Sequence, residues 1–306
     1  MLNINMEVKI AGITFKNPII AASGTAAFGA EFDAIFGLEK LGGIALKAVT
    51  LEPRAGNPSP RVAETPAGML NAVGLQNPGV DAFIAKELPR LASPKKTVLI
   101  ANIAGTVADD YILTAEKLNE TPIDMVELNI SCPNVKAGGI AFGRDPESVE
   151  RITGQVKRAL KKPLIVKLTP NTSDIAANAQ AAEQAGADAV SLINTITGMA
   201  IDTGNRKPIL ANITGGLSGP AVKPIALRMV YETAKKVSIP IIGMGGIETG
   251  EDAAAFMLVG ATAVQVGTAA LCDPQALPKI ADELTEYCRI QNISSVTELT
   301  GGLIMV

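Results

Sequence analysis

The sequence contains no histidine and no tryptophan, and only 3% of its residues are aromatic. Without histidine, the chain cannot form a Ser-His-Asp triad, a Cys-His dyad or a histidine-ligated metal site. Any general base must therefore be a carboxylate, a lysine, a tyrosine or a thiol.

Cysteine is scarce as well. Cys132, Cys272 and Cys288 lie far apart and are odd in number, so they form neither a CxxC metal motif nor a disulfide framework. This usage is typical of a reducing cytosol, and we expect a cytoplasmic protein without a metal site. The N-terminus has no signal-peptide pattern, and no apolar run approaches the roughly 18 residues of a membrane span.

Charge of either sign is limited. The 27 basic and 30 acidic residues give a net charge of −3, which provides no basic field for nucleic acid or anionic lipid. The 47% hydrophobic residues and 29 glycines suit strands that are buried on both faces. Because single α/β barrels often reach about 250 residues or more, we expect residues 1–306 to form one domain.

Eight apolar, β-rich segments recur along the chain after a short hairpin, which we expect at Val8–Phe15. Segments with helical periodicity lie between most of them. This alternation favours an α/β fold of the closed (β/α)8 TIM-barrel type over an open doubly wound sheet. The strand segments are Pro18–Ala22, Gly43–Val49, Val98–Ile103, Met125–Ser131, Leu164–Thr169, Ala189–Asn194, Pro240–Met244 and Ala263–Val266. The helical segments are Val107–Leu118, Pro146–Leu160, Asp174–Ala185, Val222–Lys236 and Asp252–Val259.

Turn and capping residues refine this plan. Asp145-Pro146 and Asp273-Pro274 each predict the start of a helix, and Gly186 predicts the end of one. Two insertions, Leu51–Asn77 after the second strand and Asp202–Gly219 after the sixth, exceed the minimal barrel. Both follow the carboxyl end of a strand, where barrel enzymes build their sites.

The segment Glu127–Asn134 contains the first candidate for chemistry. Strand alternation points Asn129 toward the barrel mouth and puts Cys132 on the loop that leaves the strand. Taken alone, Cys132 is most simply a buried apolar residue. However, Lys136 could lower the thiol pKa, and the three glycines of residues 134–143 are typical of a lid.

Two glycine-rich turns follow the last two strands. They are Gly243-Met-Gly-Gly-Ile247 and Val266-Gly-Thr268. Tight turns explain many such segments, but barrel enzymes often bind phosphate in these two loops. We therefore expect a phosphate site there.

Lys47 and Lys167 lie within apolar strands, where an unpaired charge is costly. One interpretation is an internal ion pair, for example with Glu127. The other is contact with an anionic ligand, which the amide and hydroxyl groups at neighbouring strand ends would join. The segment Asn71–Gly79 is either part of such a site or a plain loop. The polar strand-end residues are Asn102, Asn129, Asn194 and Thr195.

In their order and spacing, these segments resemble dihydroorotate dehydrogenase over nearly the whole chain. The segments that carry the resemblance are Ala22–Thr25, Leu46–Thr50, Asn71–Gly79, Glu127–Asn134, Val166–Pro170, Ile193–Thr195 and Gly243–Ile247. The cysteine at position 132 is similar to that of the class 1 enzymes. The Asn-Pro-Gly end of the 71–79 segment and the 134–143 loop resemble class 1B, the NAD-linked subclass.

The resemblance implies an FMN enzyme that oxidises dihydroorotate to orotate in pyrimidine biosynthesis, with Cys132 as the catalytic base. It also implies a partner, an electron-transfer subunit that carries FAD and a [2Fe–2S] cluster, and a homodimer of this chain within a heterotetramer. The residues expected to contact FMN are Ser23, Lys47, Ala48, Asn102, Asn129, Lys167, Ile193, Gly219, Gly245, Gly246, Gly267 and Thr268. Those expected to surround the pyrimidine are Lys47, Asn71, Ala72, Val73, Gly74, Leu75, Asn129, Asn194 and Thr195.

Other functions remain open from the residues alone. A class 1A enzyme would pass electrons to fumarate and need no partner. Another flavin barrel would act on uracil or on a tRNA uridine, although the net charge disfavours a tRNA enzyme. A barrel without cofactor would use the phosphate site as a lyase, an isomerase or a non-catalytic sensor. Bound flavin, visible as yellow colour, separates this last group from the others.

Overall fold

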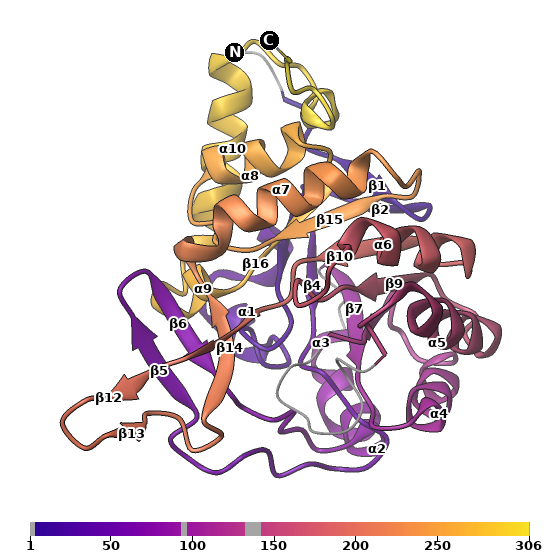
Figure 1. Cartoon of the computed structure of the whole chain (residues 1–306). Coiled ribbons are helices and arrows are strands. Elements are labelled where there is room, and N and C mark those ends of the chain that lie inside the picture. The colour runs from indigo at the N-terminus through magenta and orange to yellow at the C-terminus, as the bar shows by residue number, and fades with distance from the viewer. Residues whose placement is uncertain (1–3, 93–96, 132–141, 306) are drawn as a thin grey trace.

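The computed structural model of the chain describes residues 4–92, 97–131 and 142–305. At its centre is a closed barrel of eight parallel strands in the order β10-β15-β16-β3-β4-β7-β8-β9, so that strands consecutive along the barrel are neighbours (Figure 1). The barrel strands are β3 (Ile19–Ala21), β4 (Gly43–Ala45), β7 (Val98–Ile103), β8 (Met125–Asn129), β9 (Leu164–Lys167), β10 (Ala189–Leu192), β15 (Ile241–Met244) and β16 (Ala263–Val266). The predicted (β/α)8 barrel and its eight strands are confirmed.

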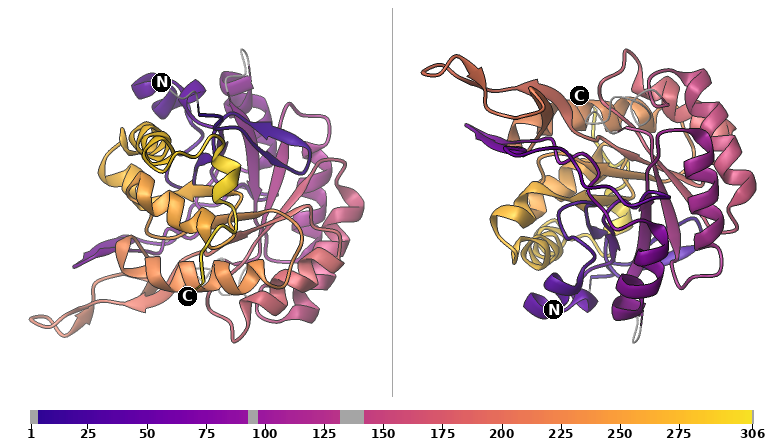
Figure 2. Two further views of the ribbon diagram at one scale, coloured as in Figure 1. Left: turned by 90° about the horizontal axis from the view of Figure 1, so that it is seen from above. Right: turned by 90° about the horizontal axis from the view of Figure 1, so that it is seen from below.

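Helices surround this barrel on the outside (Figure 2). The five predicted helical segments are confirmed to within two residues at each end. They are α4 (Ala108–Leu118), α5 (Pro146–Ala159), α6 (Ile175–Gln184), α7 (Lys223–Ala234) and α8 (Gly250–Leu258). The other helical elements are α1 (Ala30–Phe36), η1 (Leu38–Lys40), α2 (Val80–Ala82), η2 (Phe83–Glu87), α3 (Leu88–Ala92), α9 (Thr268–Cys272), η4 (Pro220–Val222), α10 (Ala276–Ile290) and η5 (Val296–Leu299). In the described part of the chain, every helix is too short or too polar to cross a membrane.

The capping predictions had different outcomes. The Asp145 side chain accepts a hydrogen bond from the Ser148 backbone N–H and begins α5 as predicted. Gly186, at φ 95°, follows the last turn of α6, also as predicted. The prediction at Asp273 was wrong by two residues, because Asp273 ends α9 and its carboxylate holds the Gln275 N–H in the turn before α10.

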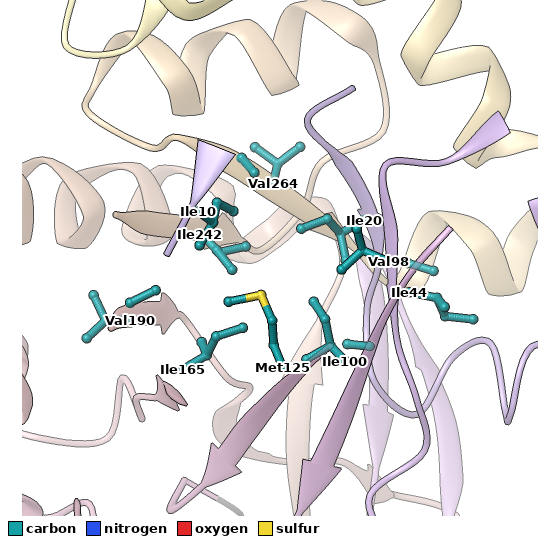
Figure 3. Packing of buried hydrophobic residues seen from close by; sticks show 14 of the residues in the cluster. Ile10, Ile20, Ile44, Val98, Ile100, Met125, Ile165, Val190, Ile242 and Val264 are labelled. Carbon is teal, nitrogen blue, oxygen red and sulfur yellow. The ribbon is translucent and has the colours of Figure 1, made fainter. Parts of the chain in front are cut away.

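The predicted N-terminal hairpin is confirmed as β1 (Val8–Ile10) paired with β2 (Ile13–Phe15). Val8, Ile10 and Phe15 are fully or almost fully buried. Figure 3 shows Ile10 close to Ile242 among aliphatic side chains from the barrel strands. The ring of Phe15 lies against Gly43, the first residue of β4, so the hairpin packs at the end of the barrel where the strands begin.

The two insertions pair with each other, which the sequence did not reveal. Together with β11, which precedes the second insertion, they form a four-stranded antiparallel sheet in the order β11-β14-β6-β5, beside the carboxyl ends of the barrel strands. The second insertion also carries a small hairpin that projects from the molecule (Figures 1 and 2). The strands of the sheet are β5 (Val62–Thr65), β6 (Gly68–Asn71), β11 (Ile196–Met199) and β14 (Thr214–Ser218), and those of the hairpin are β12 (Ile201–Asp202) and β13 (Lys207–Pro208).

Candidate functional site

A cavity of about 360 Å³ lies between the carboxyl ends of the barrel strands and the sheet formed by the insertions. In a parallel barrel this end gathers loops from all the strands, so residues far apart in sequence meet there. Most of the predicted site residues line it. They are Ser23, Lys47, Ala48, Asn71, Val73, Gly74, Leu75, Asn129, Lys167, Ile193, Asn194, Thr195, Gly219, Gly245, Gly246, Gly267 and Thr268.

Two of the predicted residues that the structure describes do not line the cavity. Ala72, the residue after β6, is fully buried with Leu70 and Leu210, because the alternation of side chains continues past the end of the strand and turns Ala72 away from the cavity. Asn102 is fully buried inside the barrel, one layer below the cavity. Cys132 lies outside the described residues, as does Lys136.

A buried carboxylate, that of Glu127, lies beneath the floor of the cavity. Glu127, on β8, has no exposed side-chain surface, and its carboxylate accepts hydrogen bonds from Asn102 Nδ2 (2.5 Å), Ser191 Oγ (2.8 Å) and Gln265 Nε2 (2.7 Å). Lys167 Nζ lies 3.7 Å from Glu127 Oε2. The predicted ion pair is therefore confirmed for Lys167, which nevertheless also lines the cavity. Together these groups satisfy a carboxylate whose burial would otherwise be strongly unfavourable.

A chain of hydrogen bonds leads from this layer to the cavity wall. Asn129 Nδ2 donates to Asn102 Oδ1 at 3.3 Å, and Asn129 Oδ1 accepts from Ser131 Oγ at 3.0 Å. Asn194 Nδ2 in turn donates to Ser131 Oγ at 2.6 Å. Two of the amides that line the cavity are thus held in fixed orientations by buried neighbours.

The 71–79 segment takes its shape from Asn77. This buried side chain accepts hydrogen bonds from the N–H groups of Thr50 and Gly79, and donates to Thr50 Oγ1 and to the Leu75 carbonyl. It therefore ties the segment to the loop that follows β4. Beyond Asn71, which ends β6, the segment is a loop as far as Gly79, and Asn71, Val73, Gly74 and Leu75 line the cavity.

One end of the cavity is made largely of backbone. A Cβ added at Gly245 would lie 2.8 Å from the Ala226 side chain, and one at Gly246 would lie 2.7 Å from the Gly219 carbonyl. Gly219 itself would meet Gly68 at 2.6 Å. Glycine is therefore required at these three positions, and a ligand can approach the main chain there closely.

Asp252, in the first turn of α8, supports this glycine-rich end. Its carboxylate accepts from the N–H groups of Glu248 and Thr249 and pairs with Lys223 Nζ at 2.6 Å. Partial burial alone would raise the pKa of Asp252, but the Lys223 charge and these hydrogen bonds outweigh it, so the pKa lies below its ordinary value. The loop that carries Gly245 and Gly246 is thus pinned to the helix by an ionised carboxylate.

Several lining residues were missed by the sequence analysis. Gln265 had a usable signal, since it is a polar residue inside the apolar strand Ala263–Val266, as Lys167 is in its own strand. Ser218 Oγ accepts from Thr268 Oγ1 at 2.8 Å, a contact that depends on how the second insertion folds back. The missed lining residues are Ala22, Gly24, Thr25, Val62, Met69, Ser218, Met244, Ile247, Glu248, Gln265, Ala269 and Leu271.

Comparison with known proteins agrees with this geometry. The family model described as dihydroorotate dehydrogenase matches residues 5–288. The chain belongs to the dihydroorotate dehydrogenase family. Similar curated proteins are named dihydroorotate dehydrogenase B (NAD(+)), catalytic subunit. The one from Alkaliphilus oremlandii is 55% identical over 99% of this chain and 100% of the relative. The one from Geotalea daltonii is 53% identical over 99% of both.

The fold is also found in a solved member of the family. The crystal structure of dihydroorotate dehydrogenase from Eimeria tenella, in complex with ferulenol, superposes with a TM-score of 0.83 at 25% sequence identity. The match covers 98% of this chain and 89% of that protein. The barrel and the elements added to it therefore have the same fold as this solved member of the family.

Proposed function

We propose that this chain is the FMN-binding catalytic subunit of an NAD-linked dihydroorotate dehydrogenase, which oxidises dihydroorotate to orotate in pyrimidine biosynthesis. The observation that carries the proposal is that similarity in sequence agrees with arrangement in space. Relatives of this name match the chain over its whole length, and the segments that resemble the family converge on one cavity at the carboxyl end of the barrel.

The cavity fits the phosphate of FMN at its glycine-rich end. Side chains are sterically excluded at Gly219, Gly245 and Gly246, so the main chain of the loops after β10 and β15 can approach phosphate oxygens. The turn after β16, at Gly267 and Thr268, lines the same end. Loops after the last two strands are the usual phosphate site of TIM barrels.

The opposite part of the cavity fits flat, polar rings. Lys47 and Lys167 are cations that can offset a carboxylate or the charge of a flavin ring. Asn71, Asn129 and Asn194 can donate and accept hydrogen bonds in the plane of a ring that carries both N–H and C=O groups. A sugar phosphate would more often require carboxylates against its hydroxyls, and Glu248 is the acidic residue that lines the described cavity beyond its floor.

The chemistry that bound FMN supplies is the acceptance of a hydride. The role of the chain's own residues is to hold the pyrimidine and to move a proton. By resemblance, Cys132 removes the proton from the ring methylene, while Lys47 offsets the substrate carboxylate. Asn129 and Asn194 fix the ring, because their amides are oriented by Asn102 and Ser131.

For the electrons to reach NAD, we propose a partner subunit that carries FAD and a [2Fe–2S] cluster, with two copies of this chain in a heterotetramer. The printed term "catalytic subunit" in the names of the relatives supports a companion chain. A fumarate-linked enzyme without a partner is the alternative.

The decisive experiment uses the purified chain. It should be yellow with a flavin absorbance band, and dihydroorotate should bleach this band under anaerobic conditions. Turnover should then be assayed with NAD and with fumarate, each with and without the co-purified partner. NAD reduction only in the presence of the partner supports the proposal, and fumarate reduction by the chain alone supports the alternative. A colourless protein that does not bind FMN contradicts both.

A further inference from the structure

The buried carboxylate of Glu127 sets the direction of the hydrogen bonds beneath the cavity. An ionised carboxylate can only accept, so each neighbour must turn a donor toward it. Asn102 and Gln265 turn their amide nitrogens to it and Ser191 turns its hydroxyl, at 2.5–2.8 Å. The oxygen and nitrogen ends of a side-chain amide are nearly equal in shape, so an amide could fit in either orientation. Contact with the carboxylate fixes the orientation, with the nitrogen toward Glu127.

This orientation is transmitted to the cavity in two directions. Because Asn102 donates to Glu127, its oxygen accepts from Asn129, and the same sense continues through Ser131 to Asn194. Because the amide nitrogen of Gln265 donates to Glu127, its Oε1 points away from Glu127. Gln265 is only 1% exposed, and no donor among the described residues forms a hydrogen bond to this oxygen. Gln265 nevertheless lines the cavity. Its Oε1 is an acceptor that a ligand N–H at the floor of the cavity would satisfy.

Stability alone does not account for a charge at this position. A buried ion pair often contributes no more than apolar residues of the same volume, and the main buried cluster of the barrel is made of apolar residues. The arrangement is better explained by what it does to the side chains above it.

We propose that Glu127 is a positioning residue for ligand recognition. Its charge fixes the orientation of Asn129 and Asn194 toward the pyrimidine, and that of Gln265 toward an N–H of the bound flavin ring. It also balances Lys167 beneath the flavin. The proposal rests on the proposed function, since it assigns these amides to FMN and to the substrate.

The test is Glu127→Gln, which keeps the volume but places an N–H among donors. At least one neighbouring amide must then reverse. We expect FMN to be retained, while the dissociation constant of orotate, measured by its perturbation of the flavin spectrum, rises about 10- to 100-fold. The midpoint potential of the flavin should move to more positive values, because Lys167 loses its counter-charge and favours the anionic reduced form.

Asp188→Asn is the matched control. Asp188 is also a barrel carboxylate, but it pairs with Lys157 and holds the Leu164 N–H at the start of β9, away from the cavity. This variant should lose stability and leave both orotate affinity and flavin potential unchanged.

Asn102→Ala provides a second route if Glu127→Gln does not fold. It removes the amide that carries the orientation from Glu127 to Asn129, and should weaken orotate binding about three- to tenfold. Wild-type orotate affinity in whichever of the two variants folds would overturn the proposal. The proposed function fails separately, if the wild-type chain neither binds FMN nor is reduced by dihydroorotate.

Discussion

Two charged residues lie inside the barrel at the floor of the cavity. Glu127 and Lys167 belong to otherwise largely apolar strands, and each is at least 93% buried in its side chain. Desolvation of such a pair costs several kcal/mol per ion unless hydrogen bonds compensate, which here come from three side chains. Charge is thus placed directly beneath the cavity, where water screens it weakly.

Cys132, which the family resemblance assigns as the base, can be tested directly. Cys132→Ala should keep FMN, as judged by the flavin absorbance, but reduce turnover of dihydroorotate by on the order of 100-fold or more, because no thiolate remains to take the proton. An ordinary thiol has a pKa of about 8.5, so wild-type turnover should rise toward alkaline pH.

The matched control is Cys272→Ser, which changes an exposed cysteine that does not line the cavity. It should turn over at the wild-type rate. Near-normal turnover in Cys132→Ala would show that the base is another residue.

At the scale of elements, the two insertions act as one unit. Strand β14 of the second lies between β11 and β6, and so brings Gly216 against Thr195 on the cavity wall. The close approach needs glycine, since a Cβ at position 216 would lie 2.0 Å from Thr195 Oγ1 and 2.6 Å from its Cβ.

Gly216→Ala should therefore displace Thr195 and raise the KM for dihydroorotate by on the order of tenfold, since misplacement of a positioning group by about 1 Å is costly. FMN content should not change. Gly198→Ala, in the neighbouring strand β11, is the control: its added methyl would lie 3.1 Å from the end of Leu70 and at an ordinary 3.7 Å from Leu217 Cβ. Equal KM values for the two variants would contradict this role of Gly216.

The first turn of α8 gives a second prediction for an element. Asp252→Ala should lower stability by about 1 kcal/mol, as the loss of a helix cap does, and should weaken FMN retention, because it frees the loop of Gly245 and Gly246. The measurements are the Tm and the flavin released on dilution. Glu298→Ala, which removes the corresponding acid of the η5 capping box far from the cavity wall, should leave FMN retention unchanged.

The lowered pKa of Asp252 also predicts a pH dependence. A carboxylate whose folded pKa is depressed contributes stability above its unfolded pKa of about 3.9, and loses it as the pH falls through the folded value. The Tm difference between wild type and Asp252→Ala should therefore be constant near neutral pH and shrink below about pH 4. A difference that persists unchanged at lower pH would exclude the charged form as its source.

For the whole molecule, the cavity links cofactor binding to stability. A ligand that binds only the folded chain stabilises it by about 2.7 kcal/mol at 100 times its Kd. We expect the apoprotein to unfold at a lower Tm than the FMN-bound protein, and FMN to restore the Tm in a concentration-dependent way. Riboflavin, which lacks the phosphate, should restore much less. Equal shifts for FMN and riboflavin would show that the glycine-rich end does not hold phosphate.

Many helices and strands could be predicted from short segments of the sequence. Each barrel strand is buried on both faces and is therefore largely apolar, and β8 and β9 could be placed despite Glu127 and Lys167. The helix start at Asp145 was found because capping is a property of adjacent residues. The start of α10 was predicted two residues too early, because Asp273 is the residue that ends α9.

The barrel, the family and many of the residues at its mouth followed from the sequence alone, because strand periodicity, caps and motif spacing involve only a few neighbouring positions. That the two insertions share one sheet, and that Ala72 turns away from the cavity, became visible only in three dimensions. The tertiary structure alone joined Glu127 to Gln265, 138 positions away along the chain. Pairing between distant strands and the direction of a hydrogen bond depend on packing in three dimensions, which no local pattern encodes.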